Sequence, residues 1–361
     1  MRNITKIVAV LVSSLIAFGS ANAGELGVSG SAKASYVINS GNSNSTGIGI
    51  SNELNFTASG EMDNGYTWNY SMELDTNAAG NTDNDDTQLT LNTNGLGTIG
   101  FFDSEGGLST ELGYGIGALG VGNDYGNTWG AGNAAPSNGF DVSNYANLQY
   151  HLPADVLPFG MGVKVGFAPN TNSGDSNSYK DSGGVTSQGA DGDTAAQIQV
   201  TAAPIDGLKV GADYIEYDNE SGLQQQGKMG GNAYLQYAMG NIKVGVNKGY
   251  TEDGVGATYG AGDGTGFDRT TITSAGIEFA MNDAVSLSFN REKFDAKDIG
   301  QIAVGAKTAT TKEVEMESDV YQVAYNVGGA TVGLFHNKTD NSDFVAGQSE
   351  KKTILSLAME F

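Results

Sequence analysis

Short turns and long polar loops alternate between the predicted strands of this chain. The clearest strand has Tyr66, Trp68, Tyr70, Met72 and Leu74 on one face and Thr, Asn, Ser, Glu and Asp side chains on the other, which is the period of two expected of a strand. Turn signals such as Asp63-Asn64-Gly65 follow every second strand. The remaining connections are long and polar: 75–86, 103–141, 170–193, 218–228, 249–268, 293–317 and 337–350. Because a sandwich has no reason to sort its loops by length in this way, the pattern predicts a transmembrane, antiparallel, up-and-down all-β barrel of about 16 strands.

The last predicted strand supports a barrel. Leu355, Leu357, Met359 and Phe361 share one face, and the face opposite carries mostly small or polar side chains. Chain ends are usually frayed and polar, whereas the closing strand of a membrane barrel must face lipid on one side and the lumen on the other. We therefore expect this strand to pair with the one that begins near Leu26.

The first 23 residues have the features of a secretory signal. Arg2 and Lys6 form a short basic region, an apolar run of residues 7–18 follows, and Ala21-Asn22-Ala23 has the small-residue pattern of a cleavage site. The run is too short for a spanning helix, which needs about 20 apolar residues. The sequence predicts export and a mature barrel domain from Gly24 to Phe361.

Composition excludes several classes of protein. The chain has no cysteine, so it has neither a disulfide framework nor thiol chemistry. Its formal net charge of −23 argues against nucleic acid as a partner. Histidine occurs only as His151 and His336, at predicted strand ends and without the nucleophile and orienting base of a hydrolase. We expect no enzymatic activity and no cofactor. Calcium bound by acidic loops, for example by Asp83, Asp85 and Asp86, stays open because carboxylates suit that ion.

Together, several segments resemble the trimeric general diffusion porins of Gram-negative bacteria, especially the alphaproteobacterial type. They are the Ala-Asn-Ala signal, residues 94–101 (NGLGTIGF), the long loop after them, residues 143–150 (SNYANLQY) and the terminal Phe361. The resemblance implies a homotrimer in the cell outer membrane, surrounded by its lipid. Each subunit would be a sixteen-stranded barrel with its third long loop folded inward to narrow a water-filled pore for small hydrophilic solutes and ions. It also implies that Phe361 acts as the assembly signal.

The candidate constriction loop is the connection 103–141, the longest in the chain. It contains five acidic residues and no basic one: Asp103, Glu105, Glu111, Asp124 and Asp141. Strand parity puts four lysines on the polar, lumen-facing side of their strands: Lys33, Lys164, Lys209 and Lys243. In the family an acidic loop faces a basic wall, but here lysines stand where the family has an arginine cluster. Rings of acidic residues favour cations, so we expect a cation-preferring channel. The alternative function is a secreted structural or adhesive β-protein that binds calcium through its acidic loops.

Overall fold

The computed structural model describes residues 26–41, 44–76, 82–110, 141–171, 194–218, 229–252, 266–303, 306–308, 313–342 and 345–361. The first half of the wall consists of β1 (Leu26–Gly41), β2 (Ser45–Glu61), β3 (Thr67–Thr76), β4 (Thr82–Asn92), β5 (Thr98–Asp103), β6 (Asn147–His151), β7 (Gly162–Ala168) and β8 (Thr194–Ala202). The second half consists of β9 (Leu208–Asp218), β10 (Met229–Met239), β11 (Ile242–Glu252), β12 (Gly266–Ala280), β13 (Val285–Ala303), β15 (Glu313–Val327), β16 (Ala330–Asp340) and β17 (Ser349–Glu360). The short strand β14 (Ala306–Thr308) pairs only with the far end of β13.

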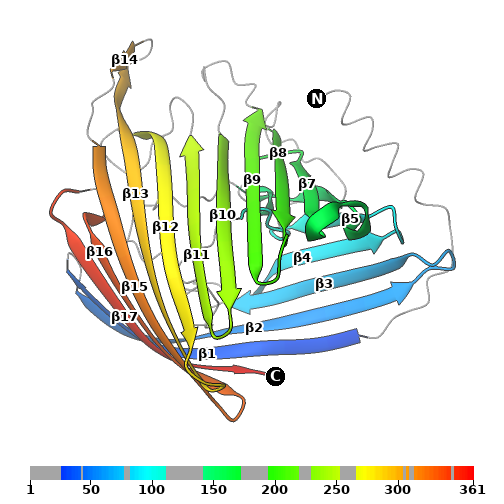
Figure 1. Cartoon of the computed structure of the whole chain (residues 1–361), viewed down its shortest axis with the longest axis horizontal. Coiled ribbons are helices and arrows are strands. Elements are labelled where there is room, and N and C mark those ends of the chain that lie inside the picture. Colours follow the sequence, from blue (N-terminus) through cyan, green and yellow to red (C-terminus); the bar gives the residue numbers. More distant parts are fainter. Residues whose placement is uncertain are drawn as a thin grey trace.

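These strands form a closed, antiparallel barrel of 16 wall strands, as the sequence predicts. Each strand pairs with its neighbours in the chain, and β17 returns to β1, with partners running from Ser31 and Glu360 to Gly41 and Glu350. Figure 1 shows the wall curving from β1 through β9 until β17 lies beside β1. Closure leaves the wall without a free edge along the paired length of its strands. No helix in the described part of the chain is long and apolar enough to span a membrane.

The short turns lie at the same end of the barrel and use the residues that such turns require. Asn94 and Gly95 have φ of 48° and 104°, and Gly328 and Gly329 have φ of 57° and 87°. Two successive positive φ values define the type I′ turn, whose twist suits a two-residue hairpin. We assign the short turns to the periplasmic side and the long connections to the extracellular side.

Alternate side chains separate into an exposed outer set and a buried inner set. On β17, Leu355, Leu357 and Met359 are 52%, 41% and 48% exposed, whereas Ile354 and Ser356 are 0% and 4% exposed. The inner set of β11–β17 is largely small and polar, as a lumen requires. It also contains an apolar cluster that the polar-inside pattern does not predict: Ile272, Phe294, Met316, Val320, Ala324, Phe335 and Ile354.

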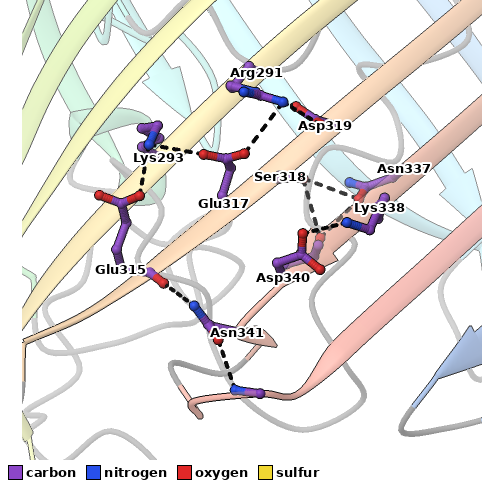
Figure 2. Close-up of polar contacts among 12 residues, drawn as sticks. Arg291, Lys293, Glu315, Glu317, Ser318, Asp319, Asn337, Lys338, Asp340 and Asn341 are labelled. Atoms are coloured by element: carbon purple, nitrogen blue, oxygen red, sulfur yellow. Dashed lines mark hydrogen bonds and ion pairs between the residues drawn. The ribbon is translucent and has the colours of Figure 1, made fainter.

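Two predicted loops are mostly strand. The connection predicted at 75–86 contains the end of β3 and the start of β4, so the backbone of Asp83, Asp85 and Asp86 lies in a strand. The connection predicted at 293–317 is largely taken up by the extensions of β13 and β15, with β14 between them. The extensions of β13 and β15 reverse the pattern of the wall, because their outer side chains are charged (Figure 2) and their inner side chains include the buried Phe294 and Met316. They therefore lack the apolar outer face from which the other strands were predicted.

Candidate pore constriction

Both described ends of the β5–β6 connection lie inside the barrel. One end runs from Ser104 to Thr110, and the other from Asp141 through the short helix η2 (Val142–Asn144) to β6. Ser104 and Gly106 have φ of 56° and 79°, which bends the chain away from the direction of β5. The side chains that hold these ends come from the inward faces of β6, β8, β9 and β10.

Asp141 joins the two ends to each other. Its carboxylate accepts hydrogen bonds from Leu108 N at 2.9 Å, Ser109 N at 2.5 Å and Ser143 N at 2.9 Å. The residue is 7% exposed. A carboxylate that accepts several backbone N–H bonds is strongly held, so Asp141 fixes the geometry of both ends.

Asp213 joins the first end to the wall. This β9 side chain accepts hydrogen bonds from Thr110 N and Thr110 Oγ1, both at 2.7 Å, and from Gln197 Nε2 at 3.3 Å. Gln197 Oε1 also accepts from Val142 N at 2.9 Å. One pair of wall side chains, on β8 and β9, therefore holds both ends of the connection.

Amide side chains complete the attachment. Gln149 donates to Gly106 O, Gln199 donates to Leu108 O at 3.0 Å, and Asn147 donates to Glu105 O at 3.1 Å. From β10, Asn232 donates to Ser109 Oγ at 3.2 Å. The first three bonds satisfy backbone carbonyl groups, and the bond from Asn232 satisfies a side-chain hydroxyl, as buried polar groups require.

Apolar side chains also hold the connection against the wall. Leu108 and Val142 are fully buried and pack with Ala168, Ala195, Ile215 and Tyr217 of the wall. A Cβ added to Gly166 would lie 2.9 Å from both Leu108 Cδ1 and Val142 Cγ2. Glycine at 166 therefore lets the connection lie directly against β7.

The five predicted acidic residues have different surroundings. Asp103 is the last residue of β5, and its Oδ1 is buried. Glu105 Oε2 accepts from Gly106 N at 2.9 Å, and Asp141 is part of the attachment. Glu111 and Asp124 lie outside the described residues.

The four predicted lysines share the parity of the buried side chains in their strands. Lys243 forms an ion pair of 2.8 Å with Glu278 of β12. Lys33 is 7% exposed, Lys209 is exposed, and Lys164 stands opposite His151 and Gln199 in the sheet. Lys164, Lys209 and Lys243 lie toward the short-turn end of their strands, whereas Lys33 lies in the middle of β1.

Lysines near the short-turn end are separated along their strands from the residues that attach the connection. Lys209 precedes its attachment residue Asp213 by four positions on β9, a separation of about 13 Å at roughly 3.3 Å per residue. The basic side chains of β7 and β9 therefore lie on the periplasmic side of the connection, on the wall that holds it.

Sequence reasoning missed the wall residues that attach the connection. Gln149, Gln197, Asp213 and Asn232 are 1–7% exposed polar side chains on neighbouring strands. The sequence contains a weak signal for them. Each is an amide or carboxylate side chain at an inward strand position, where most of the other polar residues are smaller. Without the fold, nothing in the sequence says that their partners come from the connection.

Comparison with known proteins identifies the family. The family model described as Gram-negative porin matches residues 8–314. The fold is similar to the trimer form of OmpT, an outer membrane protein of Vibrio cholerae, with 15% identity, coverage of 94% of this chain and 100% of that chain, and a TM-score of 0.61.

Two further porin structures are similar. OmpF of Salmonella typhi has 12% identity, coverage of 94% and 98%, and a TM-score of 0.60. An anion-selective porin from Comamonas acidovorans has 12% identity, coverage of 94% and 100%, and a TM-score of 0.61. No curated protein matches the chain. The match of the family model over most of the chain, on a closed barrel of sixteen strands, shows that this protein belongs to the Gram-negative porin family.

Proposed function

We propose that this outer-membrane porin lets small hydrophilic solutes and ions diffuse passively and that it prefers cations. The observation that carries the proposal is an acidic connection whose two ends are attached inside the barrel. A ring of acidic charge in a narrow aqueous path raises the local concentration of cations and repels anions.

Two of the four lumen-facing lysines, Lys243 and Lys209, oppose this preference only weakly. Lys243 is neutralised by Glu278 at 2.8 Å. Lys209 lies about 13 Å along its strand from Asp213 by the usual rise per residue, which exceeds the screening length of about 10 Å at 0.1 M salt. A porin from Comamonas acidovorans that is anion-selective has a similar fold, so the support for a cation preference comes from the acidic connection and not from the barrel.

Neutralising the acidic connection tests the preference. The triple variant Glu105→Gln, Glu111→Gln, Asp124→Asn is expected to move the reversal potential toward zero in a planar bilayer with a salt gradient. The wild-type potential should itself decline as salt rises, because the screening length falls from about 10 Å at 0.1 M to about 3 Å at 1 M. A reversal potential of the wild type that indicates anion selectivity at low salt would refute the cation preference. An unchanged reversal potential in the triple variant would mean that the connection does not determine the ion selectivity.

Export and assembly follow from the same family. We infer a homotrimer, since similar structures include a trimer, and export by the signal at residues 1–23, which lie outside the described residues. Protein purified from outer membranes is expected to begin at or near Gly24. Edman sequencing checks this, and Met1 retained on protein in the outer membrane would contradict it.

Neither catalysis nor a cofactor is part of the proposal. Within the described residues, no group of three or more His, Cys, Asp or Glu side chains could hold a metal ion. The side chains of Asp83 and Asp85 lie outside that part of the chain, so calcium binding there stays a separate hypothesis. The adhesive alternative is not favoured, because the family is one of channels.

A further inference from the structure

An aromatic side chain lies on the inner wall beside the attached connection. Tyr234 of β10 shares the inward parity of Asn232, which donates to Ser109 Oγ of the connection at 3.2 Å. Its neighbour Leu235 is 44% exposed on the outer face. Tyr234 therefore faces the lumen, two positions to the periplasmic side of a residue that attaches the connection.

A glycine lets the ring of Tyr234 lean over the wall. Gly211 of β9 stands directly opposite Tyr234 in the sheet. A Cβ added to Gly211 would lie within 3.1 Å of Cδ1, Cε1 and Cζ of the Tyr234 ring, so a larger residue at 211 would push the ring away from β9. The tyrosine is partly exposed, and a ring in this position presents apolar surface to the lumen.

An amide without partners lies on the other side of this ring. Asn247 of β11 stands directly opposite Tyr234 and is 2% exposed. Neither its Nδ2 nor its Oδ1 has a hydrogen-bond partner in the described part of the chain. The residues before and after it on the same face of β11 are Gly245 and Gly249, which have no side chain to offer. Because buried amides are normally paired, Asn247 is positioned for a partner that the wall does not supply.

Further polar groups surround the ring. On its extracellular side, Asn232 Oδ1 is buried and has no hydrogen-bond partner among the described residues. On its periplasmic side, Gln236 and the exposed Lys209 stand opposite each other in the sheet. We call Tyr234, Asn247, Asn232, Gln236 and Lys209 the tyrosine patch. It combines one aromatic ring with three neutral amides and has a single base at its edge.

The chemistry of the tyrosine patch matches an uncharged sugar. An asparagine amide holds donors and an acceptor side by side, so it can accept from one hydroxyl of a vicinal pair and donate to the next. The positive C–H groups on the face of a sugar ring suit the negative face of an aromatic ring. Small ions fit less well. Asp213, beside Asn232 in the sheet, already accepts three hydrogen bonds, and an anion would meet only one base of the patch, Lys209.

We propose that the tyrosine patch binds one ring of a neutral saccharide inside the pore, with Tyr234 as the stacking surface and Asn247 as the hydrogen-bonding residue. The inference rests on the proposed function as a pore for small hydrophilic solutes, and it names one class of solute that the pore holds. Ion preference and sugar binding use different side chains, because the acids of the connection act on charge and the patch acts on hydroxyl groups. Binding must stay weak enough for release, as passage through a channel requires.

Blockade of the ion current by sugar in a planar bilayer tests the site. Maltose should reduce the conductance of wild-type channels with a saturable concentration dependence. Tetraethylene glycol, an uncharged solute without vicinal hydroxyl pairs, should show no saturation. Tyr234→Leu and Asn247→Leu should each raise the half-blocking concentration of maltose several-fold, whereas Tyr234→Phe keeps the ring and should stay close to the wild type.

Asn69→Leu is the matched control for Asn247→Leu. Asn69 is exposed on the polar side of β3, opposite Ser59 of β2, and its replacement should leave the half-blocking concentration unchanged. Heat-modifiable migration and conductance without sugar show for every variant that its barrel has formed.

Three results would overturn the inference. An unchanged half-blocking concentration in both leucine variants would mean that maltose does not bind at the tyrosine patch. Equal blockade by tetraethylene glycol would mean that both solutes act through their size alone. A conducting wild-type channel that maltose does not block would mean that ordered water alone pairs with Asn247.

Failure of the proposed function would look different. A wild-type chain that did not conduct at all would contradict the pore itself. Equilibrium dialysis of labelled maltose against the wild type and Asn247→Leu would then decide separately whether the sugar binds, and equal binding to the two proteins would overturn the inference.

Discussion

Deletion of Phe361 is expected to reduce the yield of assembled barrel severely. Phe361 N donates to Gly30 O at 2.9 Å, and Phe361 O accepts from Gly30 N at 2.8 Å. The aromatic ring lies over the same glycine, because a Cβ added to Gly30 would be 2.8 Å from Phe361 Cε2. Phe361 therefore forms the last pair of the seam that joins β17 to β1.

The deletion is expected to lower the free energy of unfolding of the closed barrel only modestly. Two hydrogen bonds contribute about 0.5–1.5 kcal/mol each, and the ring is 70% exposed, so it buries little apolar area on β1. We expect Phe361 to act as the assembly signal, as the resemblance to porins implies, so its deletion should reduce the number of barrels that close more than the stability of those that do. Heat-modifiable migration of membrane fractions on gels measures the yield.

Matched variants separate the roles of ring and backbone. Phe361→Tyr keeps both and should assemble, whereas Phe361→Ala keeps the backbone pair with Gly30 and removes only the ring. A defect in Phe361→Ala as severe as in the deletion would assign the effect to the aromatic side chain. Normal trimer yield from the deletion would contradict the expectation outright.

The wall of the barrel could be predicted because its signals are local. Alternation in Tyr66–Leu74 and the Asn94-Gly95 turn depend only on neighbouring residues, and the structure confirms β3 and a turn with positive φ at Asn94 and Gly95. The extracellular extensions of β13 and β15 were not predicted, because their outer side chains are charged like those of a loop, although Phe294 and Met316 on the inner face are buried. Ile354 and Phe335 also escaped prediction, since apolar side chains on a lumen face depend on what packs against them.

The candidate constriction was harder to predict from the sequence than the wall, because its contacts join residues that are distant in the chain. Lumen-facing parity of Lys164 and Lys209 follows from strand period alone, and in β7 and β9 both residues share the parity of the buried side chains. The bond from Thr110 to Asp213 spans 103 positions, and only the order of strands in the closed barrel brings the two residues together. Asp141 was predicted from its negative charge to lie at the constriction, whereas its oxygens are occupied by backbone N–H groups. The charge pattern therefore identified the connection, but it did not predict which carboxylates attach it and which face the pore.

The double variant Asp141→Ala, Asp213→Ala is expected to give a wider and noisier channel. Asp141 accepts from three backbone N–H groups and Asp213 from Thr110 N, Thr110 Oγ1 and Gln197 Nε2. Each buried donor left without a partner costs about 1–3 kcal/mol. The wall strands keep their ladder bonds, so the barrel should still form while the connection loses its attachment. Single-channel recording measures both the mean conductance and its fluctuation.

The matched control removes two negative charges at positions distant from the connection. Asp206→Ala, Asp283→Ala deletes two exposed carboxylates from the short turns at the periplasmic end. Both double variants lose two negative charges, so a shift in reversal potential common to both reflects net charge. A rise in conductance and noise confined to Asp141→Ala, Asp213→Ala would reflect detachment. Asp141→Asn, Asp213→Asn should lie between the two, because the asparagine Oδ1 still accepts one bond at each site. If the alanine variant conducted with the amplitude and noise of the control, the two aspartates would stabilise the barrel without setting the width of its pore.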